Sequence, residues 1–457
     1  MNRFRSRIIK AGFWSIGGHG FGQVLRLVSN LIMTRLLAPE MFGVMAIANV
    51  LMVGFSLFSD LGLRQNIVQS KRGDDPVFLN TVWSVQIVRG IIIWFTAVSV
   101  SGVLYFAGQV GLLSVDTVYG NPILPFVIAI IAFSSIISGF ESTRLSTATR
   151  RLVQKKVVLM EVSSQLVGFV VTISWAVVDR NIWALVAGNL AGSLAKTVFS
   201  YTMLPGMSNR WKWDSVVIRE VLHFGKWVFL SSIFGFLLNS GDRLLLGGLI
   251  NADVLGVYSI AFLMINAIQM AVSKFSGVVV FPALSEVFRD RVHRLKGTYY
   301  KFRLWQDAGI LFLAGFLMSA GSVIISLLYD DRYAGAGPMM QILSLVLVAQ
   351  RYALADQCYL AMGRPNLMTM LIIIRILALY SFIPLGFYLN GIEGAVWGIV
   401  LGHFASVPAS MYLKAKYNIF DLKAELIILP AFLPGMVLGN LLSIMYPVIS
   451  TVHNGSS

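Results

Sequence analysis

Residues 12–25 read GFWSIGGHGFGQVL, and residues 225–238 read GKWVFLSSIFGFLL. The two stretches align without gaps at an offset of 213 positions, and the alignment continues to position 48. Matches between Leu or Ile residues carry little weight in an apolar chain, whereas a shared Trp, three shared Gly and a Phe-Gly dipeptide are informative. The sequence therefore predicts an internal duplication, an arrangement that is common among membrane transporters.

The composition indicates whether the chain folds in water or in a lipid bilayer. The 457 residues are 57% hydrophobic and only 12% charged, with a mean hydropathy of +0.76. A soluble domain carries about a quarter charged residues, and a helix of about 20 apolar residues crosses the roughly 30 Å hydrocarbon core. Such runs recur along the whole sequence, so we expect an all-α polytopic membrane protein. The predicted spans are residues 12–36, 41–63, 80–106, 122–141, 157–178, 182–204, 222–249, 254–282, 306–328, 338–362, 366–389, 391–413 and 425–449.

The duplication divides the predicted spans into two lobes of six helices. Because six is an even number, both halves enter the membrane in the same direction, and a pseudo-two-fold axis along the membrane normal relates them. We expect an N-terminal lobe at residues 1–210 and a C-terminal lobe at residues 211–416. Residues 417–457 form an amphipathic loop and the thirteenth segment, which either crosses the membrane or lies in its interface.

The net charge of +15 is distributed unevenly about these spans. With alternating loops assigned to opposite sides, twenty-four Lys and Arg residues fall on the side of the N-terminus and two on the other. An excess of Lys and Arg marks the cytoplasmic side. We therefore expect a cytoplasmic N-terminus in a multi-pass protein of the bacterial inner membrane, and no nucleic-acid partner.

The sequence lacks the common signatures of covalent chemistry. It contains no His-Glu-x-x-His zinc motif, no phosphate-binding Gly-rich loop and no Gly-x-Ser-x-Gly elbow. The longest loop on the outer side, residues 107–121, has Asp116 as its only charge, and the single cysteine, Cys358, forbids an internal disulfide. We expect a transporter with no catalytic residue, no metal site and no cofactor.

Polar residues follow one face of each duplicated helix. Arg26 aligns with Asn239, and Arg243 lies one helical turn further along. The polar residues on the first helix are His19, Gln23, Arg26 and Asn30. A polar stripe on a spanning helix turns away from lipid, so we expect the two stripes to line a cleft between the lobes.

Several longer stretches carry a family resemblance. Residues 241–262 read GDRLLLGGLINADVLGVYSIAF, and their N-lobe counterpart at residues 34–50 reads TRLLAPEMFGVMAIANV. Further matches are DLGLRQNIVQ (60–69), FPALSEVFRD (281–290), YDDRYAGAGPMMQIL (329–343) and GRPN (363–366). In this order and at these spacings, the sequence resembles the bacterial polysaccharide transporters, the oligosaccharide flippases of the MOP superfamily, which are distant relatives of MATE exporters.

The resemblance implies alternating access of two six-helix lobes. Such a flippase moves an undecaprenyl-pyrophosphate-linked oligosaccharide between leaflets for exopolysaccharide, capsule or lipopolysaccharide O-antigen synthesis. Its implied partners are the lipid-linked oligosaccharide, membrane lipids, the polysaccharide polymerase and other assembly proteins. Two alternatives stay open: a lipid II flippase for peptidoglycan and a MATE-like efflux transporter of small molecules.

Arginine suits a pyrophosphate cargo because its planar fork binds phosphate oxygens in pairs. The candidate substrate-binding residues are Arg26, Arg89, Arg243, Arg351 and Arg375, and the candidate polar lining is His19, Gln23, Asn30 and Asn239. For each arginine, the alternative is a structural pair between helices.

Asp242 and Asp356 are candidates for coupling to an H⁺ or Na⁺ gradient, because acids inside a membrane are costly and usually functional. Helical neighbours point about 100° apart. We therefore expect Asp242 to pair with Arg351 or Arg375 rather than with the adjacent Arg243.

Overall fold

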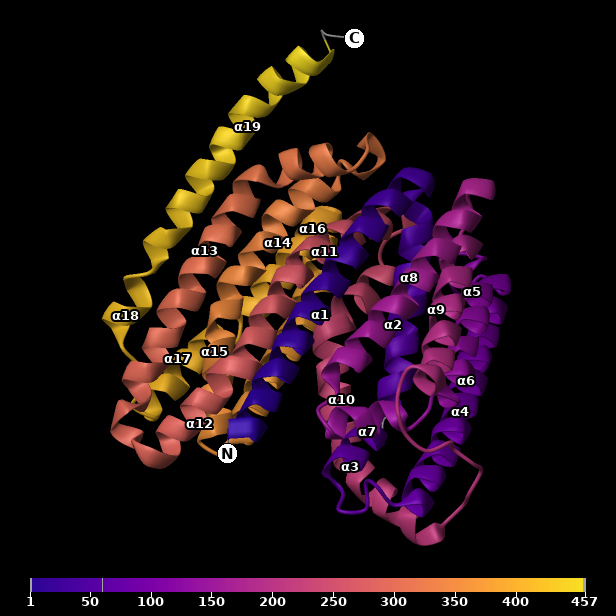
Figure 1. The fold of residues 1–457 in the computed structure, drawn as a ribbon. Helices are drawn as coiled ribbons and strands as arrows, with labels where there is room; N and C mark the ends of the chain where they lie inside the picture. The colour runs from indigo at the N-terminus through magenta and orange to yellow at the C-terminus, as the bar shows by residue number, and fades with distance from the viewer. Residues whose placement is uncertain (1, 60, 455–457) are drawn as a thin grey trace. The chain divides into compact units, whose positions relative to one another are not determined.

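Helices form the regular structure of the protein, as a chain this apolar requires, because backbone polar groups in lipid must be satisfied internally. The computed structural model describes the backbone of residues 2–59 and 61–454 (Figure 1). It describes their side chains except at residues 2–13, 15–16, 19, 224, 226–228, 230–231 and 447–454. No β-strand occurs in the described residues, which confirms the all-α prediction.

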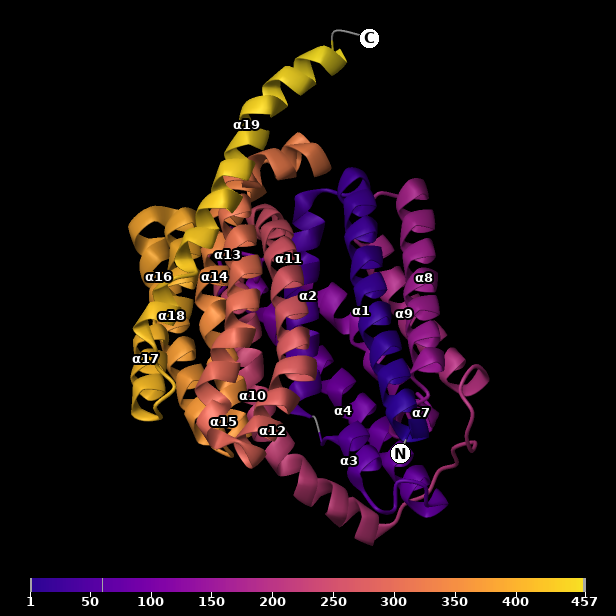
Figure 2. The ribbon, with the colours of Figure 1, turned by 60° about the vertical axis from the view of Figure 1, so that its left-hand side comes forward.

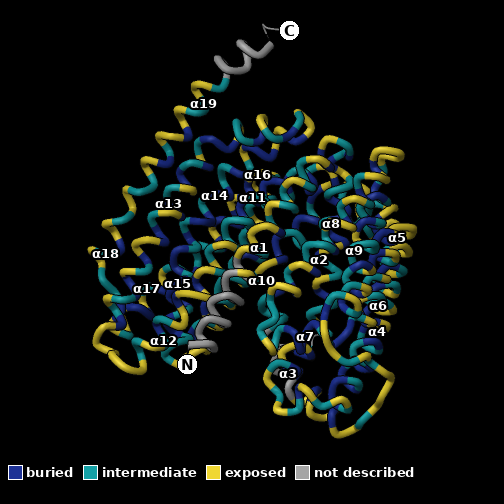
Figure 3. Tube along the Cα trace, viewed as in Figure 1, coloured by how far each residue is buried: buried dark blue, intermediate teal, exposed yellow. Residues whose placement is uncertain are grey.

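The chain forms two compact units, Met1–Phe236 and Leu237–Ser457. The division falls within one long helix, α10 (Ser215–Gly247), which begins in the first unit and ends in the second. Along most helices, exposed positions alternate with buried ones, so one face packs inside its own unit and another stays open (Figure 3). The lobe limits at residues 210 and 416 stay predictions.

Nine helices precede α10 in the first unit. They are α1 (Asn2–Leu36), α2 (Pro39–Phe58), α3 (Leu63–Gln69), α4 (Pro76–Gln109), α5 (Leu124–Ile131), α6 (Phe133–Gly139), α7 (Arg144–Arg150), α8 (Gln154–Val178) and α9 (Trp183–Thr202). Helix starts follow local chemistry: the Asp75 carboxylate accepts a hydrogen bond from the backbone N–H of Val77 at 2.9 Å, and Pro76 occupies the first turn of α4.

The second unit continues from α10 with helices that are joined in several places by short 3₁₀ or π-helical turns (Figure 2). They are α11 (Ala252–Phe275), α12 (Phe281–Asp290), α13 (Leu295–Leu328), α14 (Ala336–Gln350), α15 (Leu354–Ala361), α16 (Pro365–Phe404), α17 (Val407–Lys416), α18 (Leu422–Leu426) and α19 (Phe432–Asn454). A π-helical turn, η1 (Ser276–Val280), joins α11 to α12, and a 3₁₀ turn, η4 (Arg351–Ala353), joins α14 to α15.

Helix α16 is a hairpin of two helices, which agrees with the separate spans predicted at residues 366–389 and 391–413. Asn390 and Gly391 have non-helical dihedral angles, and Gly391 has a positive φ of 54°. A side chain at Gly386 would collide with the backbone carbonyl of Gly394, and the reverse also holds. The two halves therefore fold back on each other with glycine backbones in direct contact.

Each of the thirteen predicted spans is helical over most of its described length, with breaks within residues 41–63, 122–141 and 425–449. Eight helical segments of the described chain are long and apolar enough to cross a membrane, and nine if the bent α5–α7 segment forms one span. The hairpin of α16 counts as one of these segments together with α17. Helix α9 is not among the eight, and it carries Lys196 within its apolar sequence.

The thirteenth predicted segment packs along α13 in the second unit (Figures 1 and 2). Gly439 of α19 lies against the backbone carbonyl of Phe316, where a Cβ atom would come within 2.8 Å. The Ser319 hydroxyl donates to the carbonyl of Met436 at 3.1 Å, and the Ser443 hydroxyl donates to the carbonyl of Ser319 at 3.1 Å. The segment from Leu422 to Tyr446 is long and apolar enough to span.

A buried ion network anchors the beginning of this C-terminal segment. It contains Arg303, Asp307, Arg351, Lys414 and Glu425, each at most 3% exposed. Arg303 and Arg351 each donate from Nε to the Asp307 carboxylate at 2.9 Å. Arg303 and Lys414 both donate to the Glu425 carboxylate, and Arg351 donates to the Glu425 backbone carbonyl at 2.9 Å. The network therefore ties α18 to α13, α17 and η4.

Neutralising Glu425 tests this anchor. The Glu425→Gln variant leaves three buried cations with one carboxylate, and breaking a buried ion pair costs about 3–5 kcal/mol. We expect a clearly lower melting temperature for the full chain in detergent, measured by size-exclusion chromatography after heating. Glu393→Gln, at an exposed position of the same unit, is the control.

Adding Lys414→Met to Glu425→Gln removes one of the unpaired cations and is expected to recover part of the lost stability. Equal melting temperatures for Glu425→Gln and the Glu393→Gln control would contradict the anchoring role.

Candidate substrate-binding cavity

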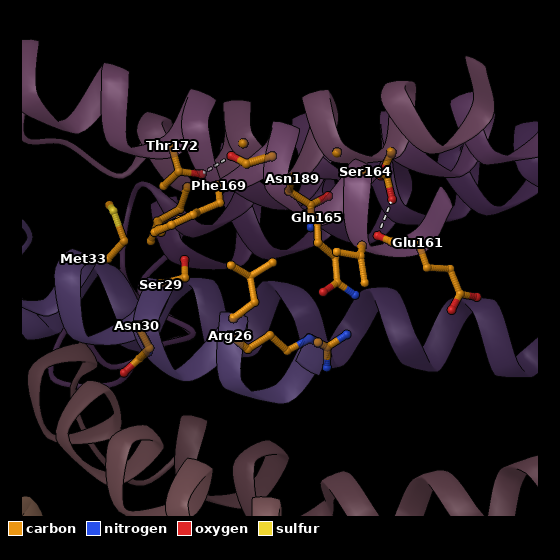
Figure 4. A pocket seen from close by; sticks show the side chains of 18 of the residues that line it. Arg26, Ser29, Asn30, Met33, Glu161, Ser164, Gln165, Phe169, Thr172 and Asn189 are labelled. Atoms are coloured by element: carbon orange, nitrogen blue, oxygen red, sulfur yellow. Dashed lines mark hydrogen bonds between the residues drawn. The ribbon is translucent and has the colours of Figure 1, made fainter. Parts of the chain in front are cut away.

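A cavity of about 840 Å³ lies within the first unit, between α1, α2, α8 and α9 (Figure 4). Nearly half of its described lining residues are polar or charged, although its four helices are largely apolar. The polar and charged lining residues are Gln23, Arg26, Ser29, Asn30, Asn49, Glu161, Ser164, Gln165, Thr172, Asn189, Ser193 and Lys196. A polar cavity inside a membrane-spanning unit indicates a place for a polar ligand.

Close packing of α8 against α9 builds one wall of the cavity. A Cβ atom at Gly168 would lie 2.8 Å from the carbonyl oxygen of Gly188, and a Cβ atom at Gly188 would collide with the Thr172 hydroxyl. Gly192 lies against Gly168 and the backbone carbonyl of Ser164. Small residues let helix backbones approach in lipid, and here they hold the polar faces of both helices toward α1.

Arg26 is the cation that most directly faces this space. Its side chain is exposed, and no hydrogen bond or ion pair joins it to another residue in the described part of the chain. In Figure 4, the Arg26 side chain runs along α1, and Gln165 and Asn189 come from the helices drawn above it. A guanidinium at this position keeps its five donors available for water or an anionic ligand.

Two further charged residues line the cavity. Lys196 of α9 pairs with Glu141, which follows α6, at 3.1 Å. Glu161 of α8 has no ion-pair partner among the described residues, and its backbone carbonyl accepts a hydrogen bond from the Ser164 hydroxyl at 2.8 Å. With Lys196 paired to Glu141, the described lining residues present one unpaired cation, Arg26, and one carboxylate without an ion pair, Glu161.

The structure brings three of the predicted stripe residues to the cavity: Gln23, Arg26 and Asn30 all line it. The side chain of His19 lies outside the described residues. The Gln165 amide packs against Gly22, where a Cβ atom would lie 3.3 Å from Oε1, and this buried oxygen has no hydrogen-bond partner among the described residues. The first polar stripe therefore meets a second polar face on α8.

The prediction for Asp242 and Arg243 was wrong about their partners. Arg243 Nε lies 3.6 Å from Asp242 Oδ1, and the Tyr258 hydroxyl donates to the other Asp242 oxygen. Arg243 also donates to the backbone carbonyl of Asn239 at 2.7 Å and stacks 4.3 Å above the Phe262 ring. The Arg243 side chain folds back toward its own helix. Its Nε therefore comes close to the carboxylate of the adjacent residue, although neighbouring side chains on a helix point about 100° apart.

Arg351 and Arg375 have other partners, so neither pairs with Asp242. Arg351 belongs to the buried ion network around Asp307. Arg375 lies 3.7 Å from Asp356 and donates to the Ser406 hydroxyl at 2.7 Å. Arg375, a predicted substrate-binding residue, therefore lies beside Asp356, a predicted coupling residue. The burial of Arg351 favours the alternative that it forms a structural ion pair between helices.

Arg89 connects two helices of the first unit. Its Nε donates to the Ser59 hydroxyl at 3.1 Å, and its Nη2 donates to the backbone carbonyl of Ser56 at 2.7 Å. These contacts tie α4 to the C-terminal end of α2. Roles in substrate binding for Arg89, Arg243, Arg351 and Arg375 stay predictions.

Sequence reasoning missed the cavity residues on α2, α8 and α9, including Asn49, Glu161, Gln165, Asn189 and Lys196. A signal was present, because Glu161 and Gln165 are one helical turn apart, as are Asn189, Ser193 and Lys196. Each stripe is short, however, and only the structure brings it beside the stripe on α1.

Substitution of Asp242 tests whether its contacts with Tyr258 and Arg243 stabilise the fold. Asp242→Ala removes the buried acceptor of Tyr258 and the counter-ion of Arg243, and leaving such groups unsatisfied costs about 1–3 kcal/mol each. We expect a lower yield of monodisperse protein and a lower melting temperature. Arg243→Gln, at a less buried position, is expected to fold with near-normal yield, and a larger loss for Arg243→Gln than for Asp242→Ala would reverse the assignment.

Similarity to known proteins agrees with this architecture. A curated relative, the lipopolysaccharide biosynthesis protein WzxC of Escherichia coli (strain K12), is 23% identical over 353 residues, which is 75% of this chain and 67% of the relative. A solved inward-facing MATE multidrug transporter of the MOP superfamily superimposes with a TM-score of 0.67 at 13% identity, covering 87% of this chain and 94% of the transporter.

The lipid II flippase MurJ in an inward closed conformation has a TM-score of 0.66 at 12% identity, covering 96% of this chain and 98% of MurJ. At these identities, the structural likeness shows the shared fold, that of the MATE-like transporters. The family model for polysaccharide biosynthesis proteins matches residues 32–336, which is more than half of the chain. The chain is therefore a polytopic membrane protein that belongs to the polysaccharide biosynthesis protein family.

Proposed function

We propose that the protein translocates undecaprenyl-pyrophosphate-linked oligosaccharide repeat units across the bacterial cytoplasmic membrane by alternating access, for the synthesis of a surface polysaccharide. The observation that carries the proposal is Arg26, an exposed guanidinium without a partner among the described residues, in a polar cavity of about 840 Å³. A pyrophosphate needs such a donor fork, and a sugar needs amide and hydroxyl groups, which the same cavity offers.

Family membership supports a role in polysaccharide synthesis, and the relative WzxC is described as a lipopolysaccharide biosynthesis protein. The cargo would be carried without covalent change, so the protein acts as a transporter and not as an enzyme. We place the N-terminus in the cytoplasm, because the Lys and Arg residues are concentrated in the loops on that side. A polymerase and other assembly proteins would receive the translocated unit.

Two alternatives keep the same fold. A lipid II flippase would serve peptidoglycan, and an efflux transporter would export small molecules. The family match favours surface polysaccharide over both. An exporter of organic cations would also be served better by acids, whereas the unpaired charges lining this cavity include a cation, Arg26, as well as one acid, Glu161.

Depletion in the native strain separates the alternatives. Our proposal predicts that lipid-linked oligosaccharide accumulates on the inner leaflet while cell-wall synthesis continues, measured by lipid extraction and by surface-polysaccharide staining. Cell lysis with normal surface polysaccharide would instead favour the lipid II alternative.

We assign coupling to an H⁺ or Na⁺ gradient to Asp242 and Asp356. Both side chains are buried, and each has one carboxylate oxygen without a hydrogen-bond partner among the described residues. A buried carboxylate can exchange its counter-ion for a proton or a sodium ion. Imposing each gradient separately on reconstituted vesicles would identify the coupling ion.

Substitution of Arg26 tests the binding role. We expect Arg26→Gln to lower surface-polysaccharide output of a complemented deletion strain at least about tenfold, because a phosphate contact is lost. Arg26→Lys is expected to retain part of the output, since it keeps the charge but loses the paired geometry. Arg35→Gln, on the same helix but not among the cavity-lining residues, is the control.

All variants must reach the membrane in equal amounts, which immunoblotting of membrane fractions measures. Normal output from Arg26→Gln at normal abundance would contradict the binding role.

A further inference from the structure

The cavity of the first unit has two chemically different ends. Among its described lining residues, only Arg26, Glu161 and Lys196 are ionisable. We call the part around these three residues the charged end. The opposite part, called the neutral end, contains Asn30, Phe42, Phe169 and Asn189.

Helix register shows that the charged residues lie at one level. Helices α8 and α9 run antiparallel, since Gly188 packs on Thr172 and Gly192 packs on the carbonyl of Ser164. About one turn toward the N-terminus of α8 leads from Ser164 to Glu161. About one turn toward the C-terminus of α9, which is the same direction in space, leads from Gly192 to Lys196. Glu161 and Lys196 therefore lie at the same end of the cavity.

Helix α1 runs parallel to α8 and extends the same division. Gly22 lies against the Gln165 amide, and Met33 belongs to the same buried apolar cluster as Ala176. Arg26 is one turn beyond Gly22, and helical side chains tilt toward the N-terminus, which carries the guanidinium back toward the charged end. In Figure 4, Arg26 extends along α1 in the direction that leads from Thr172 to Glu161 on α8.

The neutral end combines aromatic and amide groups. Phe42 and Leu185 pack against the buried cluster of Met33, Leu37, Ala176 and Ala184, which closes this end with apolar side chains. The Phe169 ring is partly exposed to the cavity. Asn189 is exposed, and no hydrogen bond within the described part of the chain uses its side-chain amide. The site thus offers a ring face next to an available donor and acceptor pair.

We propose that the neutral end binds the first sugar of the lipid-linked glycan while the charged end binds its diphosphate, an inference that rests on the proposed function. A pyranose ring has an apolar C–H face that packs on an aromatic ring and hydroxyl groups that pair with amides. The first sugar is bonded directly to the diphosphate. The two groups must therefore occupy adjacent sites, and Asn30 follows Arg26 by one turn, about 6 Å.

The polyprenyl chain is a poorer occupant of the neutral end. Hydrocarbon against Asn189 would deprive its amide group of water without replacing the hydrogen bonds, which costs about 1–3 kcal/mol per unsatisfied group. Phe169 and Asn189 therefore contribute to glycan recognition, whereas Arg26 recognises the diphosphate that every such cargo shares.

Binding of two ligands to the purified full chain tests this division. The ligands are undecaprenyl diphosphate and undecaprenyl diphosphate that carries one hexose. We expect Phe169→Leu to weaken binding of the glycosylated ligand about fivefold and to leave binding of the bare diphosphate unchanged. Arg26→Gln is expected to weaken binding of both ligands at least about tenfold.

Val170→Ala is the matched control, because Val170 is adjacent to Phe169, 58% exposed and absent from the cavity lining. It is expected to change neither affinity. Melting temperatures report whether each variant is folded. If Phe169→Leu fails to fold, Asn189→Ala replaces it, and the same loss confined to the glycosylated ligand is expected.

The outcomes distinguish the two proposals. If Arg26→Gln leaves both affinities unchanged, the cavity is not the diphosphate site and the proposed function loses its main support. If Arg26→Gln weakens both ligands but the neutral-end variant weakens both equally or neither, the diphosphate site stands and the sugar site is overturned.

Discussion

The cost of placing a charged side chain within a membrane-spanning helix governs the arrangement of this protein. The buried cations Arg303 and Arg351 share Asp307, and the half-buried Arg375 lies beside Asp356. Arg26 differs, because it is exposed in a polar cavity and has no partner among the described residues. Ion pairs hold the second unit together, whereas the cavity of the first unit keeps a cation available.

The helical fold could be predicted from hydropathy, since long apolar runs in lipid have to be helical. Each of the thirteen predicted spans is helical over most of its described length. The sequence did not indicate how helix backbones approach one another. Two contacts are examples. Gly386 meets Gly394 across the hairpin of α16, and Gly188 of α9 packs against Thr172 of α8. A pattern read along one segment contains no information about such pairs.

The candidate site could be predicted only in part, for the same reason. Gln23, Arg26 and Asn30 form a stripe on one helix, so periodicity revealed them. The cavity also needs faces of three other helices, whose short stripes were not recognised. The pairing of Asp242 with Arg243 was missed because the directions of neighbouring Cβ atoms do not describe a long side chain that folds back to its own backbone.

The central claim is that Arg26 binds the diphosphate of a lipid-linked glycan inside the first unit. The most direct test is a cryo-electron microscopy structure of the full chain with undecaprenyl diphosphate that carries one hexose. Our account predicts phosphate density within hydrogen-bonding distance of the Arg26 guanidinium, with the hexose toward Phe169 and Asn189. Density for the diphosphate elsewhere, with the cavity holding only water, would contradict it.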